Sequence, residues 1–119
     1  MTEIFVAIYN FLSQVGVPVY PENGGPVGAV LPYLTWTPVE PEWDTEAVLT
    51  VRIWSRGPSY RELAGLVDQL GALLEEPAVL ETPGGFLYLS KGDPWAQPQP
   101  LQGSDVLVMY LNIGLQAFL

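Results

Sequence analysis

The chain has 119 residues, 49% of them apolar, and it carries thirteen acidic residues, four basic residues and neither cysteine nor histidine. This length and apolar content suit one domain, residues 1–119, with a single hydrophobic core, and they exclude intrinsic disorder. Because the net charge is −9 and the basic residues form no cluster, we expect no stable binding to nucleic acid or to an anionic membrane surface.

The ends of the chain and its apolar runs give no signal for a membrane. No apolar run approaches the ~20 residues that span a bilayer. The first residues, Met1-Thr2-Glu3-Ile4, lack the basic region of a signal peptide, so we expect the mature protein to start here. The absence of cysteine fits folding in the cytosol.

The first predicted element is a helix over residues 3–15. Gly16 and Pro18 end it, because glycine adopts the left-handed cap conformation and proline cannot continue a helix. Residues 17–20 then predict a short edge strand, and 21–28 form a loop rich in glycine and proline. The helical spacing places six apolar side chains on one face: Ile4, Ala7, Ile8, Phe11, Leu12 and Val15.

A hairpin follows, with strands over residues 29–36 and 48–54. Pro32 indicates a bulge or an open edge in the first strand. Alternation in the second strand predicts an aliphatic core face and an opposite, mixed face. The core face holds Leu49, Val51 and Ile53, and the mixed face holds Val48, Thr50, Arg52 and Trp54.

The second helix is predicted over residues 60–75 and is closed by Pro77. Ser59 and Glu62 have the spacing of a capping box, in which each side chain accepts a hydrogen bond from the other residue's backbone N–H. The apolar stripe consists of Leu63, Leu66, Val67, Leu70, Leu73 and Leu74.

The last third of the chain predicts three strands. Residues 79–81 and 86–90 form a hairpin across a Thr-Pro-Gly-Gly turn, and 91–104 form a long loop that holds Trp95. The final strand, 106–118, begins apolar on both faces, which indicates a central position or a partner. The resulting order, α-β-β-β-α-β-β-β, favours an α+β fold with two helices packed on one face of a mostly antiparallel sheet.

The residue types argue against an enzyme and against a resident cofactor or metal. Without histidine and cysteine, the Ser-His-Asp and Cys-His catalytic arrangements and the usual zinc ligands are missing. Residues 24–28 resemble a phosphate loop but lack its Lys-Ser/Thr ending, so a plain loop is favoured. Four acids crowd one turn but lack calcium-loop spacing, which favours a solvated hairpin tip: Glu40, Glu42, Asp44 and Glu46.

The four tryptophans raise the hypothesis of a carbohydrate-binding surface. Trp36 and Trp54 lie within predicted strands, where packing in the core or in an interface is favoured. Trp43 and Trp95 lie in predicted loops and are better candidates for exposure. An exposed loop tryptophan more often binds a protein partner than a sugar, because large aromatic side chains dominate interface hot spots.

From about Val17 onward the chain resembles the tail-terminator, or tail-completion, family of siphophages, whose members are also described as minor capsid or head–tail joining proteins. A run Gly-Asp-Pro-Trp-Ala-Gln at residues 92–97 and an alternating final strand add to the resemblance. Its main motifs are Pro32-Tyr33-Leu34-Thr35, Arg52-Ile53-Trp54-Ser55-Arg56 and Ser59-Tyr60-Arg61-Glu62-Leu63.

The resemblance implies a small α+β subunit that assembles with its own copies into a ring, expected to be a hexamer, on the last ring of the tail tube. Such a ring stops tube growth and meets the head–tail connector, while DNA passes through it. It implies a virion protein of the tail or neck, assembled in the host cytoplasm. Residues 105–109 depart from the expected pattern because they contain no basic residue, which favours an apolar ring contact there.

We expect the loops 38–46 and 91–104 to contact neighbouring subunits or stacked rings, with Trp43 and Trp95 as anchors. Replacing Trp95 by alanine should then weaken association and leave the fold intact. A neck or head-completion protein and a carbohydrate- or protein-binding module remain as alternatives. The candidate partner-binding residues are Trp43, Asp44, Trp95, Gln97, Arg52 and Arg56.

Overall fold

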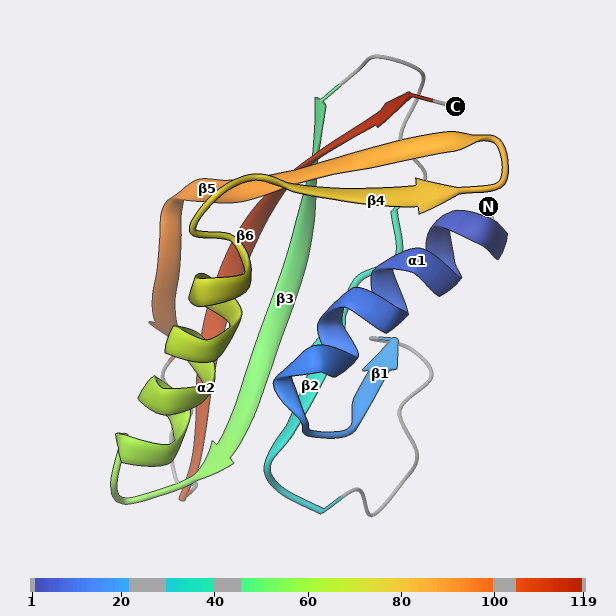
Figure 1. The fold of residues 1–119 in the computed structure, drawn as a ribbon. Helices are drawn as coiled ribbons and strands as arrows, with labels where there is room; N and C mark the ends of the chain where they lie inside the picture. The colour runs from blue at the N-terminus through green and yellow to red at the C-terminus, as the bar shows by residue number, and fades with distance from the viewer. Residues whose placement is uncertain (1, 22–29, 40–45, 100–104, 119) are drawn as a thin grey trace.

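The computed structural model describes residues 2–21, 30–39, 46–99 and 105–118 (Figure 1). Within these ranges, the chain forms two α-helices, one 3-10 helix and six strands. The elements are α1 (Thr2–Leu12), the 3-10 helix η1 (Ser13–Val15), β1 (Val19–Pro21), β2 (Tyr33–Trp36), β3 (Glu46–Arg56), α2 (Arg61–Leu73), β4 (Ala78–Thr82), β5 (Gly85–Gln99) and β6 (Val106–Phe118).

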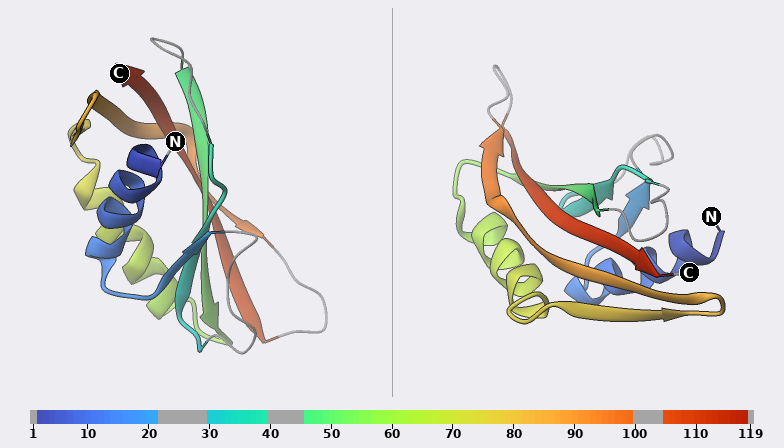
Figure 2. Two further views of the ribbon diagram at one scale, coloured as in Figure 1. Left: turned by 90° about the vertical axis from the view of Figure 1, so that its right-hand side faces the viewer. Right: turned by 90° about the horizontal axis from the view of Figure 1, so that it is seen from above.

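The described strands form one curved, mixed sheet in the order β1-β2-β3-β6-β5-β4. Strand β1 pairs with β2 in parallel, and the other neighbouring strands pair antiparallel. Both helices lie on the same side of this sheet (Figure 2). The fold is therefore α+β with the helices on one face, as expected, and its sheet is mixed because of β1.

The core lies between the helices and the covered face of the sheet. Leu49, Val51 and Ile53 of β3 have no exposed surface, which confirms the core face predicted from alternation. From the opposite side, α1 and α2 contribute Ile8, Leu12, Leu63 and Leu70, all fully buried. Strand β6 lies between β3 and β5 and is central, as its apolar start indicated.

The predicted capping box at the start of α2 is not formed. The Ser59 hydroxyl accepts a hydrogen bond from the backbone N–H of Arg61 at 3.1 Å. The Glu62 carboxylate instead accepts one from the Ser55 hydroxyl at 2.7 Å. Ser55 has no exposed surface, and a buried hydroxyl requires a hydrogen-bond partner. The Glu62 carboxylate serves as that partner and therefore does not accept a hydrogen bond from the backbone N–H of Ser59.

The long loop predicted over residues 91–104 is wrong for residues 91–99, which continue β5. These residues pair with β6 on both sides of an irregularity between Lys91 and Ala96. Central strand β6 presents backbone groups along its whole length, and pairing them outweighs the local turn preference of Gly92 and Pro94. Residues 100–104 lie outside the described residues.

Candidate functional site

The face of the sheet that the helices leave uncovered, here termed the open face, carries aromatic and polar side chains in register across its strands. Strand pairing arranges them in two rows, one that crosses β1, β2, β3, β6 and β5 and one that crosses β2, β3, β6 and β5. The arginine row consists of Tyr20, Thr35, Arg52, Tyr110 and Gln97, and the tryptophan row consists of Tyr33, Trp54, Val108 and Gln99.

Aromatic contacts connect the first three strands of the open face. The Tyr20 and Tyr33 rings meet edge to face, with centroids 5.9 Å apart. Tyr33 stacks on Trp54 with centroids 5.9 Å apart and an interplanar angle of 21°. The Trp54 indole N–H donates a hydrogen bond to the Thr35 hydroxyl at 2.9 Å. These contacts fix the rings, so a partner would meet a preorganised surface.

The guanidinium of Arg52 is held in place at the centre of the arginine row. Its Cζ lies 4.7 Å from the centroid of the Tyr110 ring, and its Nε donates to the Gln99 side-chain oxygen at 3.3 Å. With Gln97 and Pro98, these residues line a hollow of about 300 Å³. An oriented guanidinium beside amide groups suits recognition of carboxylates and backbone carbonyls.

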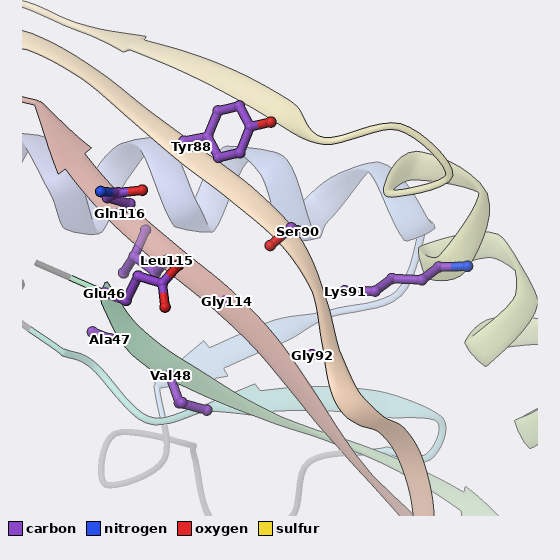
Figure 3. Close-up of a pocket in the computed structure, with 10 residues that line it drawn as sticks. All are labelled: Glu46, Ala47, Val48, Tyr88, Ser90, Lys91, Gly92, Gly114, Leu115 and Gln116. Carbon is purple, nitrogen blue, oxygen red and sulfur yellow. The ribbon is translucent and has the colours of Figure 1, made fainter. Parts of the chain in front are cut away.

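A second depression lies at the other end of the open face (Figure 3). This Glu46 hollow, of about 460 Å³, is lined among others by Glu46, Val48, Tyr88, Ser90, Gly114 and Gln116. Val48 and Tyr88 are exposed. The Lys91 side chain extends away from it toward α2 (Figure 3), where its ammonium lies 5.5 Å from the Trp95 ring centroid. The hollow is therefore an apolar depression with an acidic rim.

The structure brings together some of the predicted partner-binding residues and separates others. Arg52 and Gln97 are in the same row, on either side of Tyr110. Arg56 is exposed at the end of β3 and forms an ion pair of 2.8 Å with Asp105. Trp95 is half-buried and packs against the core on the side of α2, beside Gly71. Trp43 and Asp44 lie outside the described residues.

The tryptophans of the described residues are not flat exposed platforms for a sugar ring. Trp36 is 1% exposed and packs in the core, against Phe5 at a centroid distance of 4.9 Å. Trp54 and Trp95 are half-buried. The expectation that strand tryptophans serve packing is thus met by Trp36.

Sequence reasoning missed several members of the open face, namely Tyr20, Tyr33, Tyr110 and Gln99. Two signals pointed toward them. The non-core face of the strand around Arg52 and Trp54 was mixed rather than polar, and the final strand began apolar on both faces. A sheet face exposed only to water is expected to alternate cleanly to polar residues, and this face departs from that pattern.

The part of the chain that the structure describes contains neither a metal-binding cluster of acidic residues nor a membrane-spanning helix. No group of three or more aspartate or glutamate residues there is placed to hold a metal ion. No helix among these residues is long and apolar enough to cross a membrane.

Comparison with known proteins identifies the fold but no family. No protein-family model and no curated protein matches the chain. A chain from a structure described as "Virion of native gene transfer agent (GTA) particle" superposes with a TM-score of 0.69 at 16% identity, over 96% of this chain and 93% of its own. A second solved protein, 17% identical, gives a TM-score of 0.65 over 99% of this chain and 96% of its own. The fold is thus shared nearly end to end with these proteins.

Proposed function

We propose that this protein is a structural, non-enzymatic subunit of a phage-like virion, and specifically a tail terminator that caps the tail tube as a ring of its own copies. The observation that carries this proposal is the fold match over 96% of the chain to a component of a gene transfer agent virion. The motif resemblance to siphophage tail-completion proteins points in the same direction.

The open face supports an assembly role. Protein interfaces are enriched in tyrosine, tryptophan and arginine, and these side chains make up five of the nine residues in the two rows. Their rings and the Arg52 guanidinium are held by contacts within the face, so docking would cost little side-chain entropy. We propose that this face meets the tail-tube protein, the head–tail connector or a neighbouring copy, with Gln97 and Arg52 among its contact residues.

The charge of the chain suits a ring through which DNA passes. A net charge of −9 repels the phosphate backbone, so DNA would slide through the lumen without binding stably. In this proposal the protein assembles in the host cytoplasm and stays in the virion at the tail or neck.

A neck or head-completion role is the second candidate, because the matched chain is described only as part of a virion and not by its position there. A neck protein would bind the portal side of the joint instead of the tube. The two roles therefore predict different partners for the same fold.

Native mass spectrometry over a concentration series, alone and with purified tail tubes or connectors, tests the proposal. We expect a closed ring, near six copies, that binds the tube. Binding to connectors but not to tubes would favour the neck role. A chain that stays monomeric and binds neither assembly would contradict both.

A further inference from the structure

Two exposed features lie at opposite ends of strand β3, one a turn that carries an exposed tyrosine and the other an apolar hollow. The first is the turn between β3 and α2, residues 56–61, here termed the Tyr60 turn. Tyr60 is 52% exposed, and it is followed directly by the exposed Arg61, while the exposed Arg56 at the start of the turn is paired with Asp105. Pro58, also exposed, lies within the turn. The turn therefore presents an exposed aromatic side chain next to one exposed arginine, Arg61.

The second feature is the Glu46 hollow. Val48, which is 61% exposed, and Tyr88, which is 38% exposed, are large apolar side chains without a cover among the described elements. Gly114 contributes only backbone to the lining, and a Cβ added there would lie 3.0 Å from the Ser90 hydroxyl oxygen. Its volume of about 460 Å³ lies in the range of ligand pockets, ~300–1,000 Å³, and is ample for one aromatic side chain.

The charges of the two features are opposite. The described carboxylate of the hollow is that of Glu46, and Glu81 lies on the same open face one strand pair away, opposite Phe86. The turn carries Arg61, whose side chain is exposed, and Arg56, which is paired with Asp105. The chain has four basic residues in all, and one of them, Arg61, directly follows the exposed Tyr60. Complementary charge selects the docking partner and its orientation.

One copy cannot bring these features together. Glu46 and Arg56 are the first and last residues of β3, an 11-residue strand, so they are separated by roughly 33 Å at ~3.3 Å per residue. The strand runs from the upper end of the molecule to the lower end, where α2 begins (Figure 1). A contact between the features must therefore join two copies.

We propose that the Tyr60 turn of one copy docks in the Glu46 hollow of the next. Tyr60 packs against Val48 and Tyr88, and Arg61 meets the Glu46 carboxylate. The contact is heterologous, so it repeats from copy to copy and closes into a ring when the rotation allows. This inference rests on the ring in the proposed function and names the surfaces that build it.

A charge swap tests this contact by sedimentation and native mass spectrometry. Arg61→Glu and Glu46→Arg should each weaken self-association at least about tenfold, because each leaves two like charges facing one another. An equimolar mixture should recover association, since the altered hollow then accepts the altered turn. Glu76→Arg, an exposed site outside the hollow with the same charge change as Glu46→Arg, should associate like the wild type.

A second pair of variants tests whether the Tyr60 ring contributes to the proposed contact. Tyr60→Ser should weaken association roughly tenfold or more, whereas Tyr9→Ser, at a tyrosine on α1 that is 42% exposed, should leave it unchanged. Circular dichroism on each variant checks that the fold persists.

Association of Arg61→Glu or Glu46→Arg at wild-type strength, or a mixture that fails to recover, would overturn the inference. A wild-type chain that never self-associates would overturn it as well. Binding of such a chain to tail tubes would still support the assembly role, so the two proposals can fail separately.

Discussion

The two faces of the sheet differ in what their side chains do, although they alternate along the same strands. On β3, Leu49, Val51 and Ile53 point to the covered face and are fully buried. Their neighbours Arg52 and Trp54 point to the open face and are half-buried among aromatic and amide groups. One strand thus supplies the core with one set of residues and a surface with the other.

This contrast separates stability from recognition. Aliphatic burial on the covered face gives most of the free energy of folding, because it removes apolar area from water at ~25 cal/mol per Å². The open face gains smaller amounts from stacking, from a cation–π contact and from hydrogen bonds. A surface that contributes little to stability is available for binding.

The largest difference is expected between adjacent residues of β6. Leu111→Ala should lower the free energy of unfolding by about 2–5 kcal/mol, because it leaves a cavity in the core. Tyr110→Ala, on the open face, should cost about 1 kcal/mol through the lost contact with Arg52. Urea denaturation measures both. Equal losses would mean that the open face is part of the core.

Two glycine-to-alanine substitutions in the helical layer should change the stability in opposite directions. Gly16 has φ +89°, so Gly16→Ala should destabilise by about 1–2 kcal/mol. Gly65 is helical and exposed, with no atom within 4 Å of an added Cβ, so Gly65→Ala should stabilise by about 0.5–1 kcal/mol. Thermal unfolding measures the direction of both changes, and two shifts of the same sign would contradict the different roles assigned to these two glycines.

The hydrogen bond between Trp54 and Thr35 allows a double-mutant cycle on the open face. Trp54→Phe should cost about 0.5–1.5 kcal/mol, since it retains an aromatic ring beside Tyr33 and removes the N–H donor. Thr35→Val should lower the free energy of unfolding less in the Trp54→Phe variant than in the wild type, because the hydrogen bond that it would break is already absent. Strictly additive costs from chemical denaturation would mean that the bond contributes nothing.

The smallest effect is expected at the ion pair of Arg56 and Asp105. Their side chains are 63% and 62% exposed, so solvent screens the attraction. Arg56→Ala should change the free energy of unfolding by no more than about 0.5 kcal/mol in urea titrations. A loss above about 2 kcal/mol would assign this end of β3 a structural role that the exposure does not indicate.

Most of the fold followed from the sequence, because its signals were periodic. Helical spacing from Ile4 to Val15 and alternation from Leu49 to Ile53 both identified buried faces. The continuation of β5 past Lys91 could not be predicted, since it depends on backbone groups offered by β6, a strand that comes later in the chain. The use of Glu62 by Ser55 is equally non-local.

The candidate site was predicted only in part, for the same physical reason. Arg52 and Gln97 were named, but their proximity across Tyr110 depends on strand register, which no local pattern fixes. Trp95 was expected in a loop and is instead half-buried near α2. Its role as an interface anchor stays a prediction, as does that of Trp43, which lies outside the described residues.

The most direct test of the account is electron microscopy of tail tubes assembled with and without this protein. We expect one ring of protein density at a single tube end and an arrest of further tube growth. Tubes carrying Arg52→Ala/Tyr110→Ala protein should show weaker end occupancy, because the open face has lost its central residues. Tubes that keep growing, with no added density at either end, would contradict the proposed role.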